Sequence, residues 1–262
     1  FKTALRESNM AENTISAYLY AVNDYFSKYK TLNKRNLLLY KAHVIEQFKP
    51  KTVNLRIQAL NKFLEHVGKP KLRLKSVKVQ QRTYLENVIS QADYIFLKNK
   101  LKAEDNMWYF VVRFLAATGA RVSELIQIKV EHVRIGYFDI YAKGGKVRRL
   151  FIPQRLRDEA EKWFADTKQT SGYIFLNRFG ERITARGIAH QLKKYAERYG
   201  LNTNVVYPHS FRHRYAKNFL EAFNDIALLA DLMGHESIET TRIYLRRTAS
   251  EQQAIVDKVI IW

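Results

Sequence analysis

The sequence predicts a mainly α-helical protein that carries one small β-hairpin, and three observations indicate this class. Apolar residues recur at three- and four-residue steps through most of the chain, which is the spacing of the buried stripe on an amphipathic helix. Residues 136–153, by contrast, alternate apolar and polar side chains on both sides of Gly144-Gly145, as expected of a hairpin turn. The 262 residues are 47% hydrophobic and include only 4 prolines, so the chain can bury a core.

Residues 1–68 are expected to form a small helical bundle. Three amphipathic segments follow one another in it: residues 13–30, 32–48 and 51–67. The first begins at Asn13, a residue type that commonly caps a helix, and the last stops at Gly68. We therefore place a domain boundary at residue 68.

Residues 83–262 are expected to form a second domain that is mostly helical with a minor sheet. The hairpin at residues 136–153 lies in this domain, and residues 172–184 read as a short extended stretch with a turn. The predicted helical segments are residues 83–101, 106–119, 122–128, 154–168, 184–200 and 208–262, the last with a break at Gly234-His235.

The chain is strongly basic, which makes nucleic acid the leading partner. Its 45 Lys and Arg exceed its 25 Asp and Glu, for a formal net charge of +20 and a pI near 9.9. Residues 1–80 carry 16 positive and 5 negative side chains (+11), and the remainder carries 29 and 20 (+9). Two separately positive domains favour a clamp around a duplex, although a generally basic soluble protein also fits the charge.

Composition excludes several other classes of site. The chain has no cysteine, so disulfides, thiolate metal sites and a cysteine nucleophile are excluded. No apolar run approaches the roughly 18 residues of a membrane span, and no signal-peptide pattern opens the sequence. We expect a cytoplasmic protein without a membrane partner.

Residues 69–82, KPKLRLKSVKVQQR, lose the helical period and carry positive but no negative charges. We interpret them as an extended basic linker that follows a phosphate backbone. A solvated connector fits the composition equally well, so the boundary is the firmer inference. The candidate DNA contacts are Lys69, Lys71, Arg73, Lys75, Lys78 and Arg82.

Four short groups of polar residues follow one another in the second domain. The groups are TGARVSEL with Arg121 and Glu124, AKGGK with Lys143, PHSFRH with His209 and Arg212, and LMGHESIETTRIYLR with His235 and Tyr244. A three-residue spacing puts Glu124 on the helical face of Arg121, although a surface ion pair is the ordinary interpretation. His209 and Arg212 share the same spacing directly after Pro208, so both can face one anion at a helix N-terminus.

Phosphoryl transfer through a covalent intermediate uses all of these residue types together. A tyrosine hydroxyl attacks a phosphodiester, guanidiniums neutralise the nonbridging oxygens, and a cation protonates the leaving oxygen. We expect neither a metal nor another cofactor, because side chains supply the positive charge. The chain has 16 tyrosines, so it is this ordered set that singles out Tyr244.

The sequence resembles the tyrosine recombinases of the phage-integrase and Xer-like superfamily over essentially the whole chain. The family signature is an arginine, a hairpin lysine, a His-x-x-Arg, a histidine or tryptophan, and the tyrosine, in that order. The resemblance implies a core-binding (SAM-like) helical bundle followed by a mostly α catalytic domain. It also implies a site-specific DNA recombinase that cleaves and rejoins duplex DNA through a 3′-phosphotyrosine. Such an enzyme would come from a bacterium, a phage or another mobile element and would be associated with the nucleoid.

The resemblance assigns a role to each signature residue. Arg121 and Arg212 would hold the scissile phosphate, with Glu124 supporting Arg121. His235 would hydrogen-bond the same phosphate, and Tyr244 would be the nucleophile.

The resemblance also assigns the proton transfers. His209 would act as acid or base near the nucleophile, and Lys143 would be the general acid toward the 5′ oxygen. Lys146, on the same hairpin, is the competing candidate for the general acid.

Two other functions are compatible with the same residues. A type IB topoisomerase shares these groups but works as a monomeric swivel, and the two-domain layout favours recombination instead. A non-catalytic DNA-binding regulator would use the motif residues only to grip phosphate. Integration, excision, inversion and dimer resolution are all compatible with the sequence.

The family resemblance implies a homotetramer acting on two DNA sites. The tail ASEQQAIVDKVIIW, with apolar Ile255, Val259 and Ile260, resembles the terminal helix that family members dock into a neighbouring protomer. Packing onto its own domain is the alternative. The arm-binding domain of larger integrases is not visible, and because the chain begins at Phe1, both a small Xer-like or invertase-like enzyme and a trimmed integrase fit.

Overall fold

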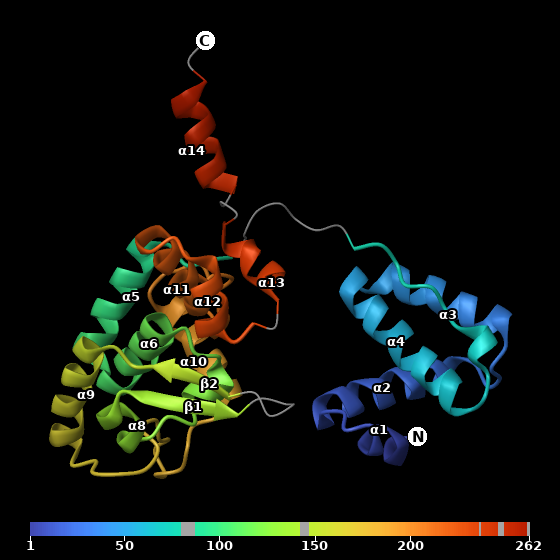
Figure 1. Ribbon diagram of the computed structural model, residues 1–262, viewed down its shortest axis with the longest axis horizontal. Helices are drawn as coiled ribbons and strands as arrows, with labels where there is room; N and C mark the ends of the chain where they lie inside the picture. Colours follow the sequence, from blue (N-terminus) through green and yellow to red (C-terminus); the bar gives the residue numbers. More distant parts are fainter. Residues whose placement is uncertain (80–86, 142–146, 236, 246–248, 261–262) are drawn as a thin grey trace. The chain divides into compact units, whose positions relative to one another are not determined.

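The computed structural model describes residues 1–79, 87–141, 147–235, 237–245 and 249–260 (Figure 1). It divides into two compact units, Phe1–Gln81 and Arg82–Trp262. The described residues are mostly helical, with one two-stranded sheet, so the predicted fold class is confirmed. None of the helices described is both long and apolar enough to cross a membrane.

Unit 1 is a helical bundle with its own core. Its elements are α1 (Lys2–Glu7), α2 (Glu12–Lys28), α3 (Lys34–Gln47), α4 (Pro50–His66) and the 3₁₀ turn η1 (Pro70–Leu72). Helix α2 begins one residue before Asn13, with Ala11 at the N-cap, and α1 was not predicted. Apolar residues of α2, α3 and α4, among them Tyr25, Leu37 and Leu60, form the core.

The first part of the predicted linker packs against this bundle. Leu74 is buried, and the side-chain amide of Asn61 bonds both its backbone N–H (2.8 Å) and its carbonyl (2.9 Å). Asn54 pairs with the backbone of Val77 in the same way. Five predicted DNA contacts stay exposed on this segment: Lys69, Lys71, Arg73, Lys75 and Lys78. Arg82 lies outside the described residues.

Unit 2 is mostly helical and contains the sheet. Its elements are α5 (Gln91–Glu104), α6 (Asn106–Thr118), α7 (Val122–Leu125), α8 (Val130–Ile135), β1 (Tyr137–Tyr141), β2 (Val147–Phe151), α9 (Gln154–Thr167), α10 (Ala185–Arg198), α11 (Pro208–Ala222), α12 (Ile226–Met233), α13 (Ile238–Arg242), η2 (Ile243–Leu245) and α14 (Ala249–Val259). The antiparallel strands pair Tyr137 with Phe151 and Tyr141 with Val147, as the hairpin pattern predicts. The tip, residues 142–146, lies outside the described residues.

Helix α6 is the central element of unit 2 and packs against α5, α9 and α11 (Figure 1). It is apolar on nearly all sides, and Phe110 stacks on Trp163 of α9 with ring centroids 4.5 Å apart. A helix with no polar face must be enclosed by other elements to be stable in water. Its C-terminus is therefore a fixed point in the middle of the unit.

Gly119 ends α6 in the left-handed conformation, with φ of 63°. A Cβ atom at this position would lie 2.4 Å from Cδ1 of Tyr215 on α11. Glycine therefore serves two needs here, the left-handed turn and the close approach of the α11 side chain. Arg121 follows two residues later, so the end of α6 determines where the first motif begins.

Gly119→Ala should destabilise unit 2 by about 3 kcal/mol, because left-handed strain of about 1 kcal/mol adds to an overpacking cost of about 2 kcal/mol. Gly200→Ala is the matched control, since Gly200 has φ of 68° but open space where a Cβ would be placed. Urea unfolding of both variants measures the difference. Equal losses would show that the contact with Tyr215 is not a constraint.

Candidate active site

Arg212 is the most enclosed charged group of the site, with 1% of its surface exposed. Pro208 occupies the first turn of α11, where its missing N–H costs nothing, and Arg212 follows one turn later on the buried face. Its guanidinium donates to the carbonyl of Gly119 (2.6 Å) at the end of α6 and to that of Met233 (2.6 Å) at the end of α12. Burial, then the charges of Arg121 and Arg148, lowers the pKa of Arg212 to about 10. Arg212 thus remains charged at neutral pH.

His235 lies directly beside this guanidinium. Arg212 Nη2 is 3.2 Å from His235 Nε2, and His235 Nδ1 is 2.8 Å from the hydroxyl of the buried Thr241. A guanidinium can only donate, so Nε2 is the acceptor and the imidazole carries its proton on Nδ1. Contacts on both nitrogens therefore fix the orientation and the tautomer of the ring.

Tyr244 lies in η2 with only 4% of its surface exposed. Its ring is parallel to that of His235 (centroids 6.2 Å apart) and tilted against that of His213 (5.4 Å). Burial raises the pKa of the Tyr244 phenol, while the charges of Arg212 and Arg121 act in the opposite direction. The phenol is thus protonated at rest and must lose its proton when it attacks.

His213, one turn after His209 on α11, was not predicted as a site residue. The two imidazole rings meet edge to face at 4.5 Å, with His209 exposed and His213 reaching Tyr244. The buried Nδ1 of His213 has no hydrogen-bond partner among the described residues. The i, i+4 spacing within HSFRH places both rings on one helix face, but it does not show that Tyr244 packs there.

Glu124 forms the second part of the site, where it binds Arg121 twice. Its carboxylate accepts from the backbone N–H of Arg121 (2.7 Å) and from its Nη1 (2.8 Å). The Glu124 side chain is only 10% exposed whereas that of Arg121 is 41% exposed, so this is not an ordinary surface ion pair. Arg121 also donates to the carbonyl of Gly234 (3.3 Å), which joins it to the His235 turn.

Arg148 of β2 is a further site residue that sequence reasoning missed. Its side chain is 9% exposed and donates to Glu124 at 2.5 Å. In the strand pattern Arg148 and Leu150 are buried while Val147, Arg149 and Phe151 are exposed. That alternation was the available signal, since it places a charged residue in the buried register of a strand.

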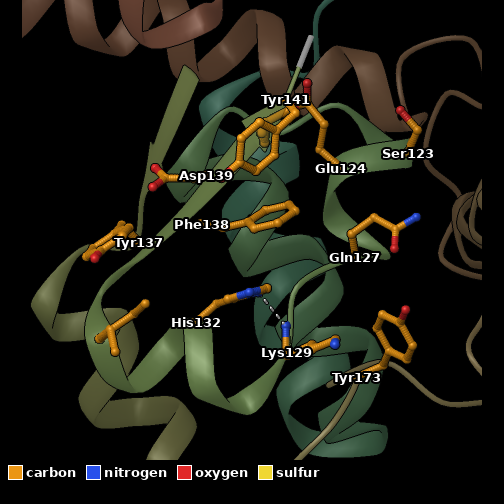
Figure 2. A pocket seen from close by; sticks show the side chains of 12 residues that line it. Ser123, Glu124, Gln127, Lys129, His132, Tyr137, Phe138, Asp139, Tyr141 and Tyr173 are labelled. Atoms are coloured by element: carbon orange, nitrogen blue, oxygen red, sulfur yellow. Dashed lines mark hydrogen bonds between the residues drawn. The ribbon is translucent and has the colours of Figure 1, made fainter. Parts of the chain in front are cut away.

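Two pockets meet at Glu124. One of about 860 Å³ is lined by Arg121, Arg148 and His235 together with apolar residues of β2 and α12. The other, of about 680 Å³, is shown in Figure 2, where Glu124 and Tyr141 lie at one end and Lys129 with His132 at the other. The first pocket is lined by two of the predicted catalytic residues, Arg121 and His235, so it is the candidate place for a phosphate.

The structure brings together five of the six predicted catalytic residues: Arg121, His209, Arg212, His235 and Tyr244. They come from segments far apart in sequence, namely the ends of α6 and α12, the first turns of α11, and η2. Lys143 and its competitor Lys146 lie outside the described residues, so the choice between them stays a prediction. The arrangement presents fixed guanidiniums and neutral imidazoles around one phenol.

Known proteins resemble this chain over nearly its whole length. Tyrosine recombinase XerA of Pyrococcus furiosus is 28% identical over 270 residues, covering 98% of this chain and 92% of the relative. Tyrosine recombinase XerD of Listeria innocua is 28% identical over 276 residues, covering 92% and 90%. A family model described as the phage integrase family matches residues 78–251.

Solved structures show the same fold. The Tn1549 transposon integrase in complex with transposon right end DNA has a TM-score of 0.73 at 14% identity, covering 98% of this chain and 97% of the other. XerH site-specific recombinase bound to difH substrate has a TM-score of 0.70 at 17% identity, covering 97% and 84%. Fold and relatives define the class as that of the tyrosine recombinases, as the sequence predicts. This chain belongs to the phage integrase family.

The stability of unit 2 should fall as the pH is lowered from about 6.5 to 4. Burial and the neighbouring cationic side chains lower the pKa of His213 and of His235 from 6.5 to about 4. The unfolded chain therefore binds protons that the folded chain excludes, and the stability present above pH 6.5 is lost toward pH 4.

Thermal melts of wild type and His213→Gln across this range measure the effect. The His213→Gln variant should lose less stability on acidification than wild type, whereas His190→Gln, on the exposed side of α10, should follow wild type. Parallel curves for wild type and His213→Gln would contradict the assignment of a neutral, half-buried His213.

Proposed function

We propose that this chain cleaves and rejoins duplex DNA at specific sites, with Tyr244 as the nucleophile. The Tyr244 oxygen forms a bond to the scissile phosphorus, the bond to the 5′ oxygen breaks, and the 3′ phosphate stays attached to the tyrosine. The departing 5′ oxygen takes a proton, which we assign to Lys143. The observation that carries this proposal is a buried phenol beside the guanidinium of Arg212 and a fixed, neutral His235.

The cations suit the transition state of this reaction. Arg212 is immobilised by two carbonyls and Arg121 by Glu124, so both charges are in place before the phosphate gains negative charge. We assign both to the nonbridging oxygens, and His235 to a hydrogen bond on the same phosphate. His209, exposed next to His213, would exchange the phenolic proton.

DNA is the partner that the charge distribution supports. Both units are positive, and the 3′-phosphotyrosine stores the energy of the broken bond, so rejoining needs no nucleotide cofactor. We propose that residues 1–68 and 83–262 contact DNA separately and that the basic segment 69–82 follows the backbone between them. With DNA as its substrate, we expect the protein to act in the cytoplasm.

Covalent capture on nicked DNA tests the activity. The substrate is a library of duplexes that carry random sequence beside a nick. Cleavage next to the nick releases a short fragment that diffuses away, so rejoining is prevented and wild type accumulates a protein–DNA adduct that survives denaturation. Tyr244→Phe should bind the recovered duplex within about threefold of wild type but form no adduct, because only the attacking oxygen is removed.

The outcomes of the capture experiment separate the candidate functions. An adduct on Tyr244→Phe would place the nucleophile elsewhere. Failure of wild type to form any adduct would indicate a regulator that binds DNA without cutting it. Relaxation of supercoiled DNA by dilute protein, without paired sites, would indicate a topoisomerase.

We further propose that the enzyme acts as a homotetramer on two sites and that α14 docks into a neighbouring protomer. Val256, Val259 and Ile260 are 50%, 55% and 46% exposed, so the apolar side of the tail is not covered by its own unit. An exposed apolar stripe on a short helix is typical of a surface that binds a partner.

Removal of residues 249–262 should prevent synapsis. The truncated chain should bind one site with wild-type affinity but should fail to pair two sites, as measured by native gel or by mass photometry. Val256→Lys with Val259→Lys is the matched full-length control, and it should reproduce the defect because lysine cannot enter an apolar pocket. Normal pairing by both variants would overturn tail exchange.

A further inference from the structure

Arg148 bonds two other segments of the site, the Glu124 turn and the end of α12, and is largely shielded from solvent. Its Nη2 donates to Glu124 at 2.5 Å and its Nη1 to the carbonyl of Leu232 at 2.9 Å. Its buried Nε has no partner among the described residues. Arg148 lines the pocket beside Arg121, but both of its terminal nitrogens are occupied by protein acceptors and only 9% of its side chain is exposed, so it is less suited than Arg121 to bind a phosphate.

One consequence of these contacts concerns Arg121. Glu124 holds the half-exposed Arg121 through its backbone N–H and its Nη1, and the same carboxylate is anchored on its other side by Arg148. A carboxylate with one flexible partner can rotate, whereas one clamped between two guanidiniums has a defined orientation. Arg148 thus constrains Arg121 through Glu124 without touching it.

The other consequence concerns the His235 turn. Gly234 has φ of 60°, and a Cβ atom there would lie 2.4 Å from Cδ of Arg148. The aliphatic stem of Arg148 therefore packs directly on the turn, while its head holds the Leu232 carbonyl just before the turn. Because His235 follows Gly234, one side chain contacts the groups that hold both Arg121 and His235.

We infer that Arg148 is a positioning residue for strand cleavage, acting on Arg121 through Glu124 and on His235 through the Gly234 turn. The inference rests on the proposed function, because it concerns the same reaction. Burial lowers the pKa of Arg148, because the charged guanidinium loses hydration at this position. A charge retained in such a place, with both terminal nitrogens donating to protein acceptors, points to a role in holding other groups.

The test compares Arg148→Met, Arg148→Lys and Arg113→Met on the duplex recovered by covalent capture. Arg113 pairs with Glu159 between α6 and α9, so its variant removes a partly buried ion pair elsewhere in unit 2. Arg148→Met should slow adduct formation about 100-fold with duplex binding within about threefold, because small misplacements of reacting groups cost that much. Arg148→Lys, which keeps the charge but only one of the two contacts, should lose about tenfold. Arg113→Met should retain the wild-type rate per folded molecule.

A change in the substrate separates positioning from general damage to the fold. A methylphosphonate at the scissile position replaces one anionic oxygen with an uncharged methyl group, so a guanidinium facing that oxygen is no longer needed. On one of the two diastereomers, Arg148→Met should therefore form the adduct at nearly the wild-type rate. A defect in folding would slow cleavage of both diastereomers and of the ordinary phosphate alike, and that result would overturn the inference.

The double variant gives an independent measurement. If Arg148 acts on Arg121 through Glu124, Glu124→Gln with Arg148→Met should cleave no more than about threefold slower than the slower single variant. Fully multiplicative losses would overturn the coupling. If Arg148→Met does not fold, the Arg148→Lys variant tests the inference instead: its rate of adduct formation should be reduced on the ordinary phosphate and restored on the methylphosphonate. Wild-type cleavage by every Arg148 variant overturns this inference alone, whereas absence of any wild-type adduct overturns the proposed function as well.

Discussion

The burial of the Arg212 charge is the constraint on which the rest of the catalytic unit depends. A guanidinium with 1% of its surface exposed loses nearly all of its hydration, which is tolerable only if fixed acceptors replace the water. The acceptors here are the carbonyls of Gly119 and Met233, which lie at the ends of α6 and α12. A helix end has unpaired carbonyls, so both helices must stop where Arg212 needs them. The left-handed glycines Gly119 and Gly234 make those stops.

Because neutral carbonyls hold Arg212, the site contains more positive than negative charge. Glu124 contacts two guanidiniums, Arg121 and Arg148, while Arg212 is held by neutral carbonyls. The excess of positive charge, together with burial, keeps the imidazoles of His213 and His235 neutral at pH values well below 6.5, with pKa values of about 4. An anion entering this region would relieve the repulsion, and a phosphodiester in its transition state carries more negative charge than at rest. The arrangement therefore favours the transition state over the ground state, which is the requirement for catalysis.

Site residues that lie three or four positions apart on one helix could be predicted from the sequence. Contacts between residues that are distant in sequence could not. Arg121 with Glu124 and His209 with Arg212 are three residues apart, so helical spacing alone places the two members of each pair on neighbouring positions of one turn. Arg148 reaches partners 24 and 84 residues away, which no periodicity encodes.

Fold prediction shows the same division between local and distant information. The apolar α6 and the glycine-centred hairpin were predictable from their own residues. Short α1 and α8 were not, because six-residue helices gain their stability from tertiary packing more than from their own sequence.

The position of Tyr244 links the chemistry to assembly. Only Leu245 and residues 246–248 separate the nucleophile from the start of α14, and a fully extended chain covers at most about 3.6 Å per residue. The position of α14 therefore limits the positions that Tyr244 can take. If the tail docks into a second protomer, as we propose, the nucleophile is tethered at one end to its own η2 and at the other to a neighbour. Association can then change the placement of the phenol relative to Arg212, which gives the enzyme a physical means to withhold cleavage until its partners are in place.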